Sequence, residues 1–512
     1  MRLHGGAICA LLVACGGGER VETTVAREVR ETSAEPSGPP DLTQGEDVTA
    51  ELRAKQSDRF RDPPSIFRRI ETTDVEAPTP ERTELGYRIQ LPSGAPVMTP
   101  TVYGDKVVVS GGFRSRTMYA FNTHSGEPAW AIGLGDDGPS NAACEDEVCV
   151  FNTESCTIFG VDANTGRLLW SWYLGDPLMS APSIDGGLVF AAYPATGGGT
   201  YPAGEDRPIP EEMSHALAAF DLHTGELKWT RWIDAEVISA PVAWMGKLYA
   251  TTFAGTVMRF DQQSGLLEQA RSANATSAPA MIDGHVVVSR RFEEGTGEQM
   301  ETRESLMMMK AEGKPGGGES ESRPAPYLNR EFQQRTQYDF SSSDLDAANG
   351  FSEAPASANM RRARALIGRN TVHGLQEFQG SWVLGLGSRN IALMGSALVG
   401  FDRESGREMW AVPMPGDLAQ LGGTLGSAPA SAGNRVVVGT VSGELLIVDP
   451  DRGEVDRRLS VGAPVRTQPA VHEGWVYVGT SNGQLVAMNT GNRRLTGWTT
   501  WAANSARTGQ PE

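Results

Sequence analysis

The sequence predicts an all-β protein, an eight-bladed β-propeller built from four-stranded antiparallel blades. Two observations point to this fold. An apolar run followed by Asp or Asn, a turn with Gly and then usually Trp recurs along the chain, as in LAAFDLHTGELKW. Each copy also contains short β-branched or aliphatic runs separated by tight-turn residues such as Ser-Asn-Gly. Short strands repeated at a fixed period are typical of propeller blades, whose radial arrangement leaves only short edges exposed.

The Asp or Asn that follows the third apolar run of each copy defines the period. We call these residues the anchors: Asn122, Asp162, Asp221, Asp261, Asp402, Asp449 and Asn489. Successive anchors are separated by 40, 59, 40, 141, 47 and 40 residues, so the unit is 40 residues long and carries insertions. The longest interval holds a degenerate copy with Lys310 at the anchor position, which brings the number of units to eight.

Each repeated residue has an expected structural role. The anchor side chain can accept hydrogen bonds from backbone amides of the following turn, in which Gly supplies a positive φ. Four tryptophans lie eight residues past their anchors and are expected to pack between neighbouring blades: Trp130, Trp170, Trp229 and Trp410. Residues 85–91 alternate like a strand, so we expect them to complete the last blade and close the ring.

The N-terminus has the pattern of a lipoprotein export signal. Arg2 precedes a short apolar run that ends in Leu-Val-Ala-Cys, which resembles a bacterial lipobox, so residues 1–15 are expected to be signal peptide and lipobox with Cys15 lipidated. An ordinary secretory signal with a chance cysteine is the alternative. Gly16 is not the Asp of an inner-membrane retention signal, which favours an outer-membrane, periplasm-facing location.

Composition divides the rest of the chain. Residues 16–83 are rich in Glu, Arg, Thr and Pro with few aromatics, so we expect a disordered tether. Residues 84–500 are expected to form the propeller, with insertions at about 194–214 and 311–369, and residues 501–512 a C-terminal tail. Either insertion can be a recognition loop on a rigid scaffold. The second insertion, 311–369, can equally be a disordered surface excursion without a partner.

Charge and cysteine content limit the possible functions. The chain has 45 basic and 63 acidic residues, a net charge of -18, which argues against nucleic acid and against a basic lipid-binding patch. Membrane contact is therefore expected only through the lipid anchor. Cys144 and Cys149 flank a tight hairpin and can form a disulfide, which export permits; with Cys156 they can equally be three small buried residues.

The module A-F-D-x-x-T-G-x-x-x-W resembles the repeat of the quinoprotein-like (PQQ-type) propellers. That group includes quinone-dependent dehydrogenases and the BamB family of outer-membrane assembly lipoproteins, and the resemblance spans residues 92–498. Similarity to BamB implies a non-catalytic periplasmic scaffold whose partners are envelope proteins, among them the outer-membrane β-barrel insertase. The partner-contacting loops of that family cannot be aligned here, so no contact residue is transferred.

Two other functions remain as alternatives. The resemblance to dehydrogenases implies a calcium site, an Asp base and commonly two adjacent cysteines, but this chain has no adjacent cysteines. Its seven histidines show no metal-ligand spacing, and its Gly runs lack the Lys of a phosphate loop. We therefore predict no enzyme and no catalytic, cofactor-binding or metal-binding residue. An envelope sensor or carbohydrate-binding propeller is the other alternative.

Overall fold

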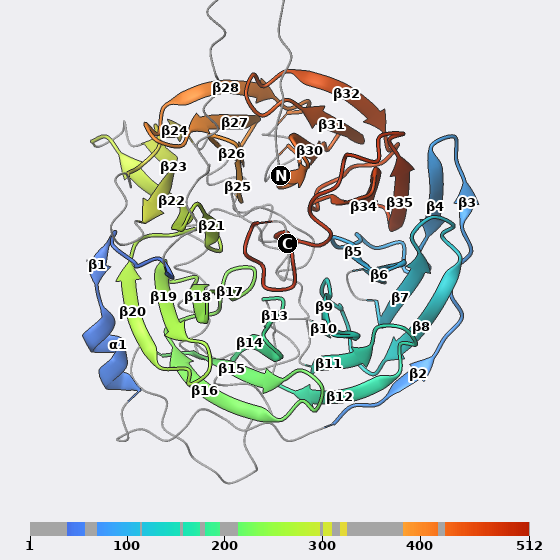
Figure 1. Cartoon of the computed structure of the whole chain (residues 1–512), viewed down its shortest axis with the longest axis horizontal. Coiled ribbons are helices and arrows are strands. Elements are labelled where there is room, and N and C mark those ends of the chain that lie inside the picture. The colour runs from blue at the N-terminus through green and yellow to red at the C-terminus, as the bar shows by residue number, and fades with distance from the viewer. Residues whose placement is uncertain are drawn as a thin grey trace, which may run out of the picture. The chain divides into compact units, whose positions relative to one another are not determined.

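Eight antiparallel sheets surround a common centre in the part of the chain that follows Glu35 (Figure 1). The computed structural model describes residues 38–56, 69–112, 115–153, 157–174, 180–194, 213–296, 301–309, 318–324, 382–417 and 425–510. The predicted eight-bladed propeller is confirmed. We number the blades 1 to 8 in chain order.

Within each blade the strands follow one another from the centre outward. Blade 1 contains β5 (Thr101–Tyr103), β6 (Lys106–Ser110), β7 (Thr117–Asn122) and β8 (Pro128–Leu134). Blade 2 contains β9 (Ala143–Glu145), β10 (Val148–Asn152), β11 (Thr157–Asp162) and β12 (Leu168–Tyr173). Blade 3 contains β13 (Ser183–Asp185), β14 (Leu188–Pro194), β15 (His215–Asp221) and β16 (Leu227–Ile233). Blade 4 contains β17 (Val242–Trp244), β18 (Lys247–Thr251), β19 (Thr256–Asp261) and β20 (Leu267–Ser272).

The second half of the ring repeats this order. Blade 5 contains β21 (Ala280–Ile282), β22 (His285–Glu294), β23 (Glu301–Met309) and β24 (Arg323–Pro324). Blade 6 contains β25 (Val383–Leu386), β26 (Arg389–Met394), β27 (Ala397–Asp402) and β28 (Glu408–Pro413). Blade 7 contains β29 (Ala430–Ala432), β30 (Arg435–Gly439), β31 (Glu444–Val448) and β32 (Val455–Ser460). Blade 8 contains β33 (Ala470–His472), β34 (Trp475–Gly479), β35 (Gln484–Asn489) and β4 (Gly86–Gln90).

The position of a strand in its blade explains its sequence. The two middle strands lie between neighbouring blades and are buried on both faces, so they are continuous apolar runs; in β30 and β31 every residue after the first is buried. The outermost strand of the same blade, β32, is mostly exposed. The apolar core is therefore a set of inter-blade layers around the ring.

Blade 8 closes the ring as the sequence predicts. Strand β4 lies antiparallel to β35, with Tyr87 opposite Ala487, so the last blade takes its fourth strand from the N-terminal side of blade 1. This pairing of distant segments leaves no open edge between the first and last blades.

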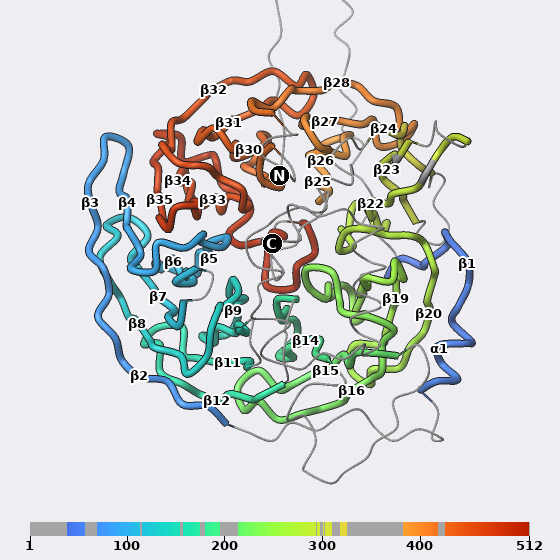
Figure 2. Tube along the Cα trace, turned by 180° about the vertical axis from the view of Figure 1, so that it is seen from behind, coloured from blue at the N-terminus to red at the C-terminus, as the bar shows by residue number. Residues whose placement is uncertain are grey.

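The tether expectation is wrong for residues 40–56 and 70–82. Strands β1 (Glu46–Asp47), β2 (Thr72–Asp74) and β3 (Glu81–Arg82) add to the outer edges of blades 4, 1 and 8, and helix α1 (Thr49–Lys55) lies beside blade 4 (Figures 1 and 2). Leu42 and Leu52 are 1% and 6% exposed. This segment does not form a core of its own, which composition correctly indicates; it uses the apolar surface of the propeller instead.

Several sequence expectations fall on residues outside the described ranges. These are the signal peptide with Cys15, the degenerate anchor Lys310, Cys156 and most of both insertions. In the described part of the chain, no helix is long and apolar enough to cross a membrane.

Candidate functional site

Each anchor side chain closes the turn that follows the third strand of its blade. Asp162 Oδ1 accepts hydrogen bonds from the amides of Asn164 and Thr165 at 3.0 and 2.9 Å, and from the Thr165 hydroxyl at 2.9 Å. Turn amides donate to the side chain of every other predicted anchor: Asn122, Asp221, Asp261, Asp402, Asp449 and Asn489. The hydroxyl of Ser264 holds the pKa of Asp261 below its ordinary value. Each anchor side chain therefore stabilises the turn of its own blade.

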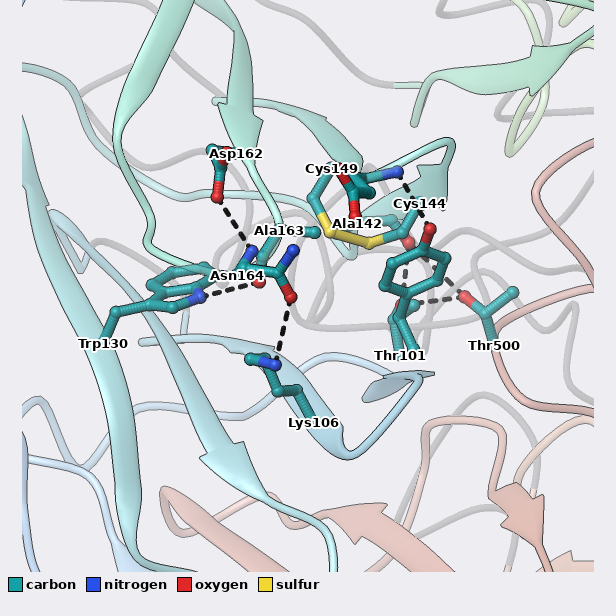
Figure 3. Close-up of a disulfide and its surroundings, with 12 residues drawn as sticks. Thr101, Lys106, Trp130, Ala142, Cys144, Cys149, Asp162, Ala163, Asn164 and Thr500 are labelled. Carbon is teal, nitrogen blue, oxygen red and sulfur yellow. Dashed lines mark hydrogen bonds between the residues drawn. A yellow bond between two sulfur atoms is a disulfide. The ribbon is translucent and has the colours of Figure 1, made fainter.

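The four repeat tryptophans join each blade to the next. Trp130 Nε1 donates to the carbonyl of Ala163, one residue past the next anchor, at 3.0 Å (Figure 3). A Cβ on Gly166 in the same turn would lie 2.8 Å from the Trp130 ring, so this turn needs glycine for close contact as well as for its φ of 72°. Trp170, Trp229 and Trp410 repeat the arrangement on Leu222, Gln262 and Pro450.

A β-bulge accompanies the tryptophan. The register between the third and fourth strands shifts by one residue directly after the pair Ala120–Trp130, and the same shift follows Gly160–Trp170. A bulge re-aims the side chains beside it, and here it lies next to the indole that reaches the next blade.

The residue at the tryptophan position, which we call the junction residue, differs around the ring. From blade 1 to blade 8 it is Trp130, Trp170, Trp229, Gln269, Gly318, Trp410, Arg457 and Tyr87. Arg457 and Tyr87 keep the hydrogen bond to the next blade, with a guanidinium or a hydroxyl as donor in place of the indole. The Arg457 guanidinium donates to Thr490 O at 2.7 Å, and the Tyr87 hydroxyl donates to Thr123 O at 3.1 Å.

The junction between blades 4 and 5 is filled by the N-terminal segment. Gln269 accepts a hydrogen bond from Leu42 N at 2.7 Å and donates to Asp41 at 3.0 Å. Leu42 packs in a cluster with residues of both blades, including Tyr249 and Met307.

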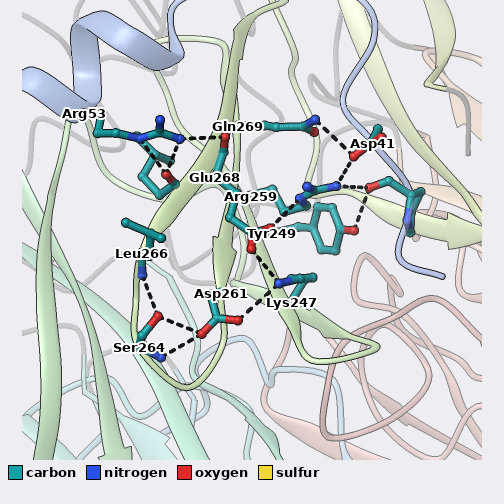
Figure 4. A network of polar contacts seen from close by, with 12 residues as sticks. Asp41, Arg53, Lys247, Tyr249, Arg259, Asp261, Ser264, Leu266, Glu268 and Gln269 are labelled. Carbon is teal, nitrogen blue, oxygen red and sulfur yellow. Dashed lines mark hydrogen bonds and ion pairs between the residues drawn. The ribbon is translucent and has the colours of Figure 1, made fainter. Parts of the chain in front are cut away.

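Polar contacts hold the backbone of this segment in place (Figure 4). Tyr249 Oη and Arg259 donate to Pro40 O at 2.8 and 3.0 Å, and Arg271 donates to Leu42 O at 3.0 Å. A residue from outside the repeat thus takes the place of a tryptophan.

The C-terminal segment lies at the centre of the ring (Figures 1 and 2). Its backbone carbonyls accept hydrogen bonds from the innermost strands of five blades. The pairs are Val102–Thr499, Ile184–Ser505, Ala243–Ala506, Met281–Thr508 and Val471–Trp498, at 2.6 to 3.0 Å. The segment expected to be a simple tail, residues 501–510, is therefore part of the folded propeller.

A buried arginine stabilises this central segment. Arg507 is 0% exposed and donates to Trp501 O, Thr500 Oγ1 and Pro182 O at 2.9, 3.1 and 3.3 Å. Its guanidinium also lies 5.4 Å from the Trp501 ring centroid. Because a buried cation is costly without such partners, the contacts fix one conformation of the centre.

Cys144 and Cys149 form a disulfide across the inner hairpin of blade 2 (Figure 3). They stand opposite each other in the pairing of β9 with β10. The bond lies within one blade. Beside it, burial raises the pKa of Glu145, which accepts a hydrogen bond from Ser505 of the central segment at 3.2 Å.

One arrangement that sequence reasoning missed resembles a hydrolytic triad. Ser214 Oγ lies 2.8 Å from His215 Nδ1, and His215 Nε2 lies 3.2 Å from Glu236 Oε2. These side chains are nearly inaccessible to solvent, and the Ser214 hydroxyl donates to Asp234 O at 2.8 Å. The arrangement therefore links blades 3 and 4 and presents no nucleophile to a substrate. Within the described ranges, no three His, Cys, Asp or Glu side chains are grouped as a metal site.

Comparison with known proteins identifies the repeat. The model of the family described as outer membrane protein assembly factor BamB matches residues 191–289 and 395–510. The BamB of Nitrosomonas eutropha is 22% identical over 202 residues, which covers 36% of this chain and 44% of that protein. This chain is a β-propeller of the PQQ-like repeat type, similar to BamB. The match spans less than half of the Nitrosomonas relative's length.

Two solved structures are similar to this chain. The BamB of Moraxella catarrhalis is 15% identical with a TM-score of 0.35, over 83% of this chain and 97% of that one. The quinohemoprotein alcohol dehydrogenase of Comamonas testosteroni is 12% identical with a TM-score of 0.50, over 80% of this chain and 76% of that one. At this identity, the likeness to the dehydrogenase concerns the fold alone.

Proposed function

We propose that this propeller is a non-catalytic, lipid-anchored scaffold that binds envelope proteins in the periplasm and aids the assembly of outer-membrane β-barrels. Similarity to BamB supports the class of function. The net charge of -18 suits a partner with a cationic surface.

The filled centre of the ring carries the proposal. A quinone or sugar bound there would have to displace the segment around Trp498 and Arg507, both 0% exposed, and break its hydrogen bonds to the inner strands. Removing the partners of a buried charge costs several kcal/mol, on the order of 3 to 5. The centre is built as a structural core, so we assign binding to the outside of the ring.

The outer edges are suited to binding extended segments. In the described part of the chain, β12, β16, β28 and β32 pair on one side only, whereas the N-terminal strands β1, β2 and β3 already cover the edges of blades 4, 1 and 8. An open edge can take a partner strand through backbone hydrogen bonds. The protein's own N-terminal segment shows that such an addition fits this propeller.

The lipid anchor at Cys15 limits where the propeller works. Pro40, which accepts a hydrogen bond from blade 4, follows Cys15 by 25 residues. Such a stretch reaches at most about 80 to 90 Å, so the ring stays near the membrane surface.

The test is affinity purification of the tagged, full-length protein from its native envelope in detergent, with mass spectrometry and an absorbance scan for quinone. Recovery of a β-barrel insertase without quinone supports the scaffold, and Cys15→Ser is expected to move the protein out of the membrane fraction. Recovery of stoichiometric quinone, or of no barrel-assembly component, would contradict the proposal.

A further inference from the structure

The residue that follows the junction residue lies at the outer edge of its blade, and we call it the edge residue. From blade 1 to blade 8 the edge residues are Ala131, Ser171, Thr230, Ala270, Glu319, Ala411, Arg458 and Arg88. Alanine occurs in blades 1, 4 and 6, so the edges of these three blades can be compared directly.

Two of the three alanine edges are covered by the protein's own N-terminal segment. In blade 1, Val75 N donates to Ala131 O at 3.3 Å, next to the pairing of β2 with β8. In blade 4, Val48 N donates to Ala270 O at 3.1 Å, next to the pairing of β1 with β20. Both covering strands run antiparallel to the edge. The same contact, a valine amide on an alanine carbonyl, thus recurs at both edges.

The two covering segments also share a sequence. Each valine follows an aspartate, as Asp47-Val48 and as Asp74-Val75. Both valines are half-buried, whereas both aspartates are exposed. Val48 packs against an apolar cluster of blades 3 and 4, and Val75 lies so close to Gly133 that an added Cβ there would come within 2.9 Å of its Cγ1. An alanine edge therefore contacts the valine and leaves the aspartate in solvent.

Blade 6 has the same edge without a cover. In the described part of the chain, β28 pairs with β27 alone and lies on the rim of the ring (Figures 1 and 2). Met414 N donates to Ser396 O inside the blade at 2.9 Å. Because successive residues of a strand point their backbone groups to alternate sides, Ala411 O faces outward. Ala411 is exposed, whereas Ala270 under its cover is 0% exposed.

The side chains beside Ala411 suit an apolar guest. Met409 is 41% exposed, and the one charged residue of β28, Glu408, is paired with Arg323 at 3.4 Å. The open edge of blade 7 differs, because its edge residue Arg458 is charged and 52% of its side chain is exposed. Side chains of neighbouring strands contribute to the stability of a sheet. Met409 therefore offers a β-branched guest residue an apolar neighbour.

One residue of β28 limits the pairing. Pro413 stands where blade 1 has Gly133 and blade 4 has Ser272, and proline has no amide hydrogen to donate. A side chain at this place is compatible with a cover, since Ser272 pairs with Glu46 of β1. Proline on an edge is a usual means of preventing indiscriminate strand addition. A segment bound at Ala411 is therefore short, as β1 and β2 are.

We propose that the outer edge of β28 binds a short extended segment of a protein partner, with a valine amide donating to Ala411 O. The two covering strands determine the chemistry of this segment: an antiparallel strand with a β-branched residue, preceded by a polar residue that stays in solvent. Strands of outer-membrane barrels alternate apolar and polar residues, so a barrel-assembly scaffold meets such segments. The inference deepens the proposed function and rests on it only in this choice of partner.

The first experiment measures the fluorescence anisotropy of a labelled peptide that copies residues 71–77, ETTDVEA, with the full-length protein. Ala411→Pro blocks the edge, because it removes the outward amide without breaking a hydrogen bond inside the blade. Arg458→Pro is the matched control, the same change on the open edge of blade 7. We expect wild type and Arg458→Pro to bind equally, and Ala411→Pro to bind at least about fivefold more weakly, the size of one hydrogen bond.

A second peptide tests the edge without altering the protein. N-methylation of its valine removes the N–H that would donate to Ala411 O, so its binding to wild type should also weaken at least about fivefold. Thermal unfolding checks that the proline variants fold, and Ala411→Ser, which copies the edge residue of blade 2, should bind like wild type. No binding by wild type, equal binding by Ala411→Pro, or equal binding of the N-methylated peptide would overturn the edge site.

Affinity purification separates this inference from the proposed function. Lower recovery of the insertase with Ala411→Pro supports both. Unchanged recovery overturns the edge as the partner site and leaves the scaffold in place, and so does a wild-type dimer that Ala411→Pro dissociates in sedimentation, because a second copy would then be the occupant. Peptide binding at the edge without any barrel-assembly component in the envelope would overturn the scaffold alone.

Discussion

The junctions on either side of blade 5 differ from the junction between blades 3 and 4, although all occupy equivalent places in the ring. Trp229 joins blade 3 to blade 4 by its ring and its N–H. Leu42, from outside the repeat, fills the junction of blades 4 and 5, and at the next junction the backbone of Glu319 and Ser320 lies against the turn glycine Gly406. A propeller repeat thus needs the junction volume filled, but the residue that fills it need not belong to the repeat.

The largest expected effect is at a tryptophan junction. Trp229→Ala should lower the free energy of unfolding by about 3 to 5 kcal/mol, because it removes a buried ring between two blades. Guanidinium unfolding followed by circular dichroism measures this. Trp229→Phe keeps most of the ring and should lose about 1 kcal/mol with its hydrogen bond.

Leu266→Ala is the surface control, since Leu266 is 55% exposed in the turn next to this junction. It should stay within about 0.5 kcal/mol of wild type. Equal losses for Trp229→Ala and Leu266→Ala would show that the indole does not join the blades.

A smaller effect is expected where the N-terminal segment fills the junction. Leu42→Ala should cost about 2 to 3 kcal/mol, at the low end for a buried leucine, because the segment can detach without unfolding the ring. Trypsin cleavage after Arg53, which donates to Leu267 O at 2.8 Å, should become faster. Leu227→Ala, at a residue 36% exposed on β16, is the control. Unchanged cleavage in Leu42→Ala would mean that Leu42 does not hold the segment.

The disulfide should matter less, because it lies within blade 2 and joins no neighbours. Cys144 and Cys149 are five residues apart, and closing so short a loop stabilises by about 2 kcal/mol. The double variant Cys144→Ala/Cys149→Ala should lower Tm to the value that reduced wild type shows. A loss as large as that of Trp229→Ala would place the disulfide among the contacts between blades.

The stability of the contact between blades 3 and 4 depends on pH through a buried acid. Burial raises the pKa of Asp234, whose carboxylate accepts a hydrogen bond from Thr256 of blade 4 at 2.6 Å. Because the pKa is raised, Asp234 stays protonated to a higher pH in the folded state than in the unfolded state. Its contribution to the free energy of unfolding is therefore complete below about pH 4 and is lost as pH rises. Asp234→Asn does not titrate, so its stability relative to wild type should increase from pH 4 to pH 8.

Asp402→Asn is the control with the opposite sign. The Ser405 hydroxyl lowers the pKa of Asp402, so the wild-type carboxylate adds stability above the ordinary Asp pKa. This variant should lose stability relative to wild type as pH rises. Parallel pH profiles for the two variants would contradict the assignment of Asp234.

The repeat made the blade architecture predictable. Anchors such as Asp162 and Asp402 recur at a readable period, and the closing strand β4 was recognisable by its alternation. The tryptophans also pointed to inter-blade packing, because an indole eight residues past four of the anchors is expected to make the same contact each time.

Parts outside the repeat were not predictable, for a physical reason. Arg507 and Leu42 are buried only because the finished ring offers them a centre and an open junction, and neither lies in a periodic pattern. The place of Gly318 in blade 5 was missed because this blade is the degenerate copy, where register had to come from backbone pairing.

Amide hydrogen exchange tests most directly whether the junction residue determines how tightly two blades meet. The turn at 162–166 is backed by the Trp130 ring, and the equivalent turn at 402–406 by the backbone of Glu319 and Ser320. The amides of residues 162–166 should exchange at least tenfold faster in Trp130→Ala than in wild type, whereas the amides of residues 402–406 should keep their wild-type rate. Equal exchange of residues 162–166 in wild type and Trp130→Ala would contradict the account.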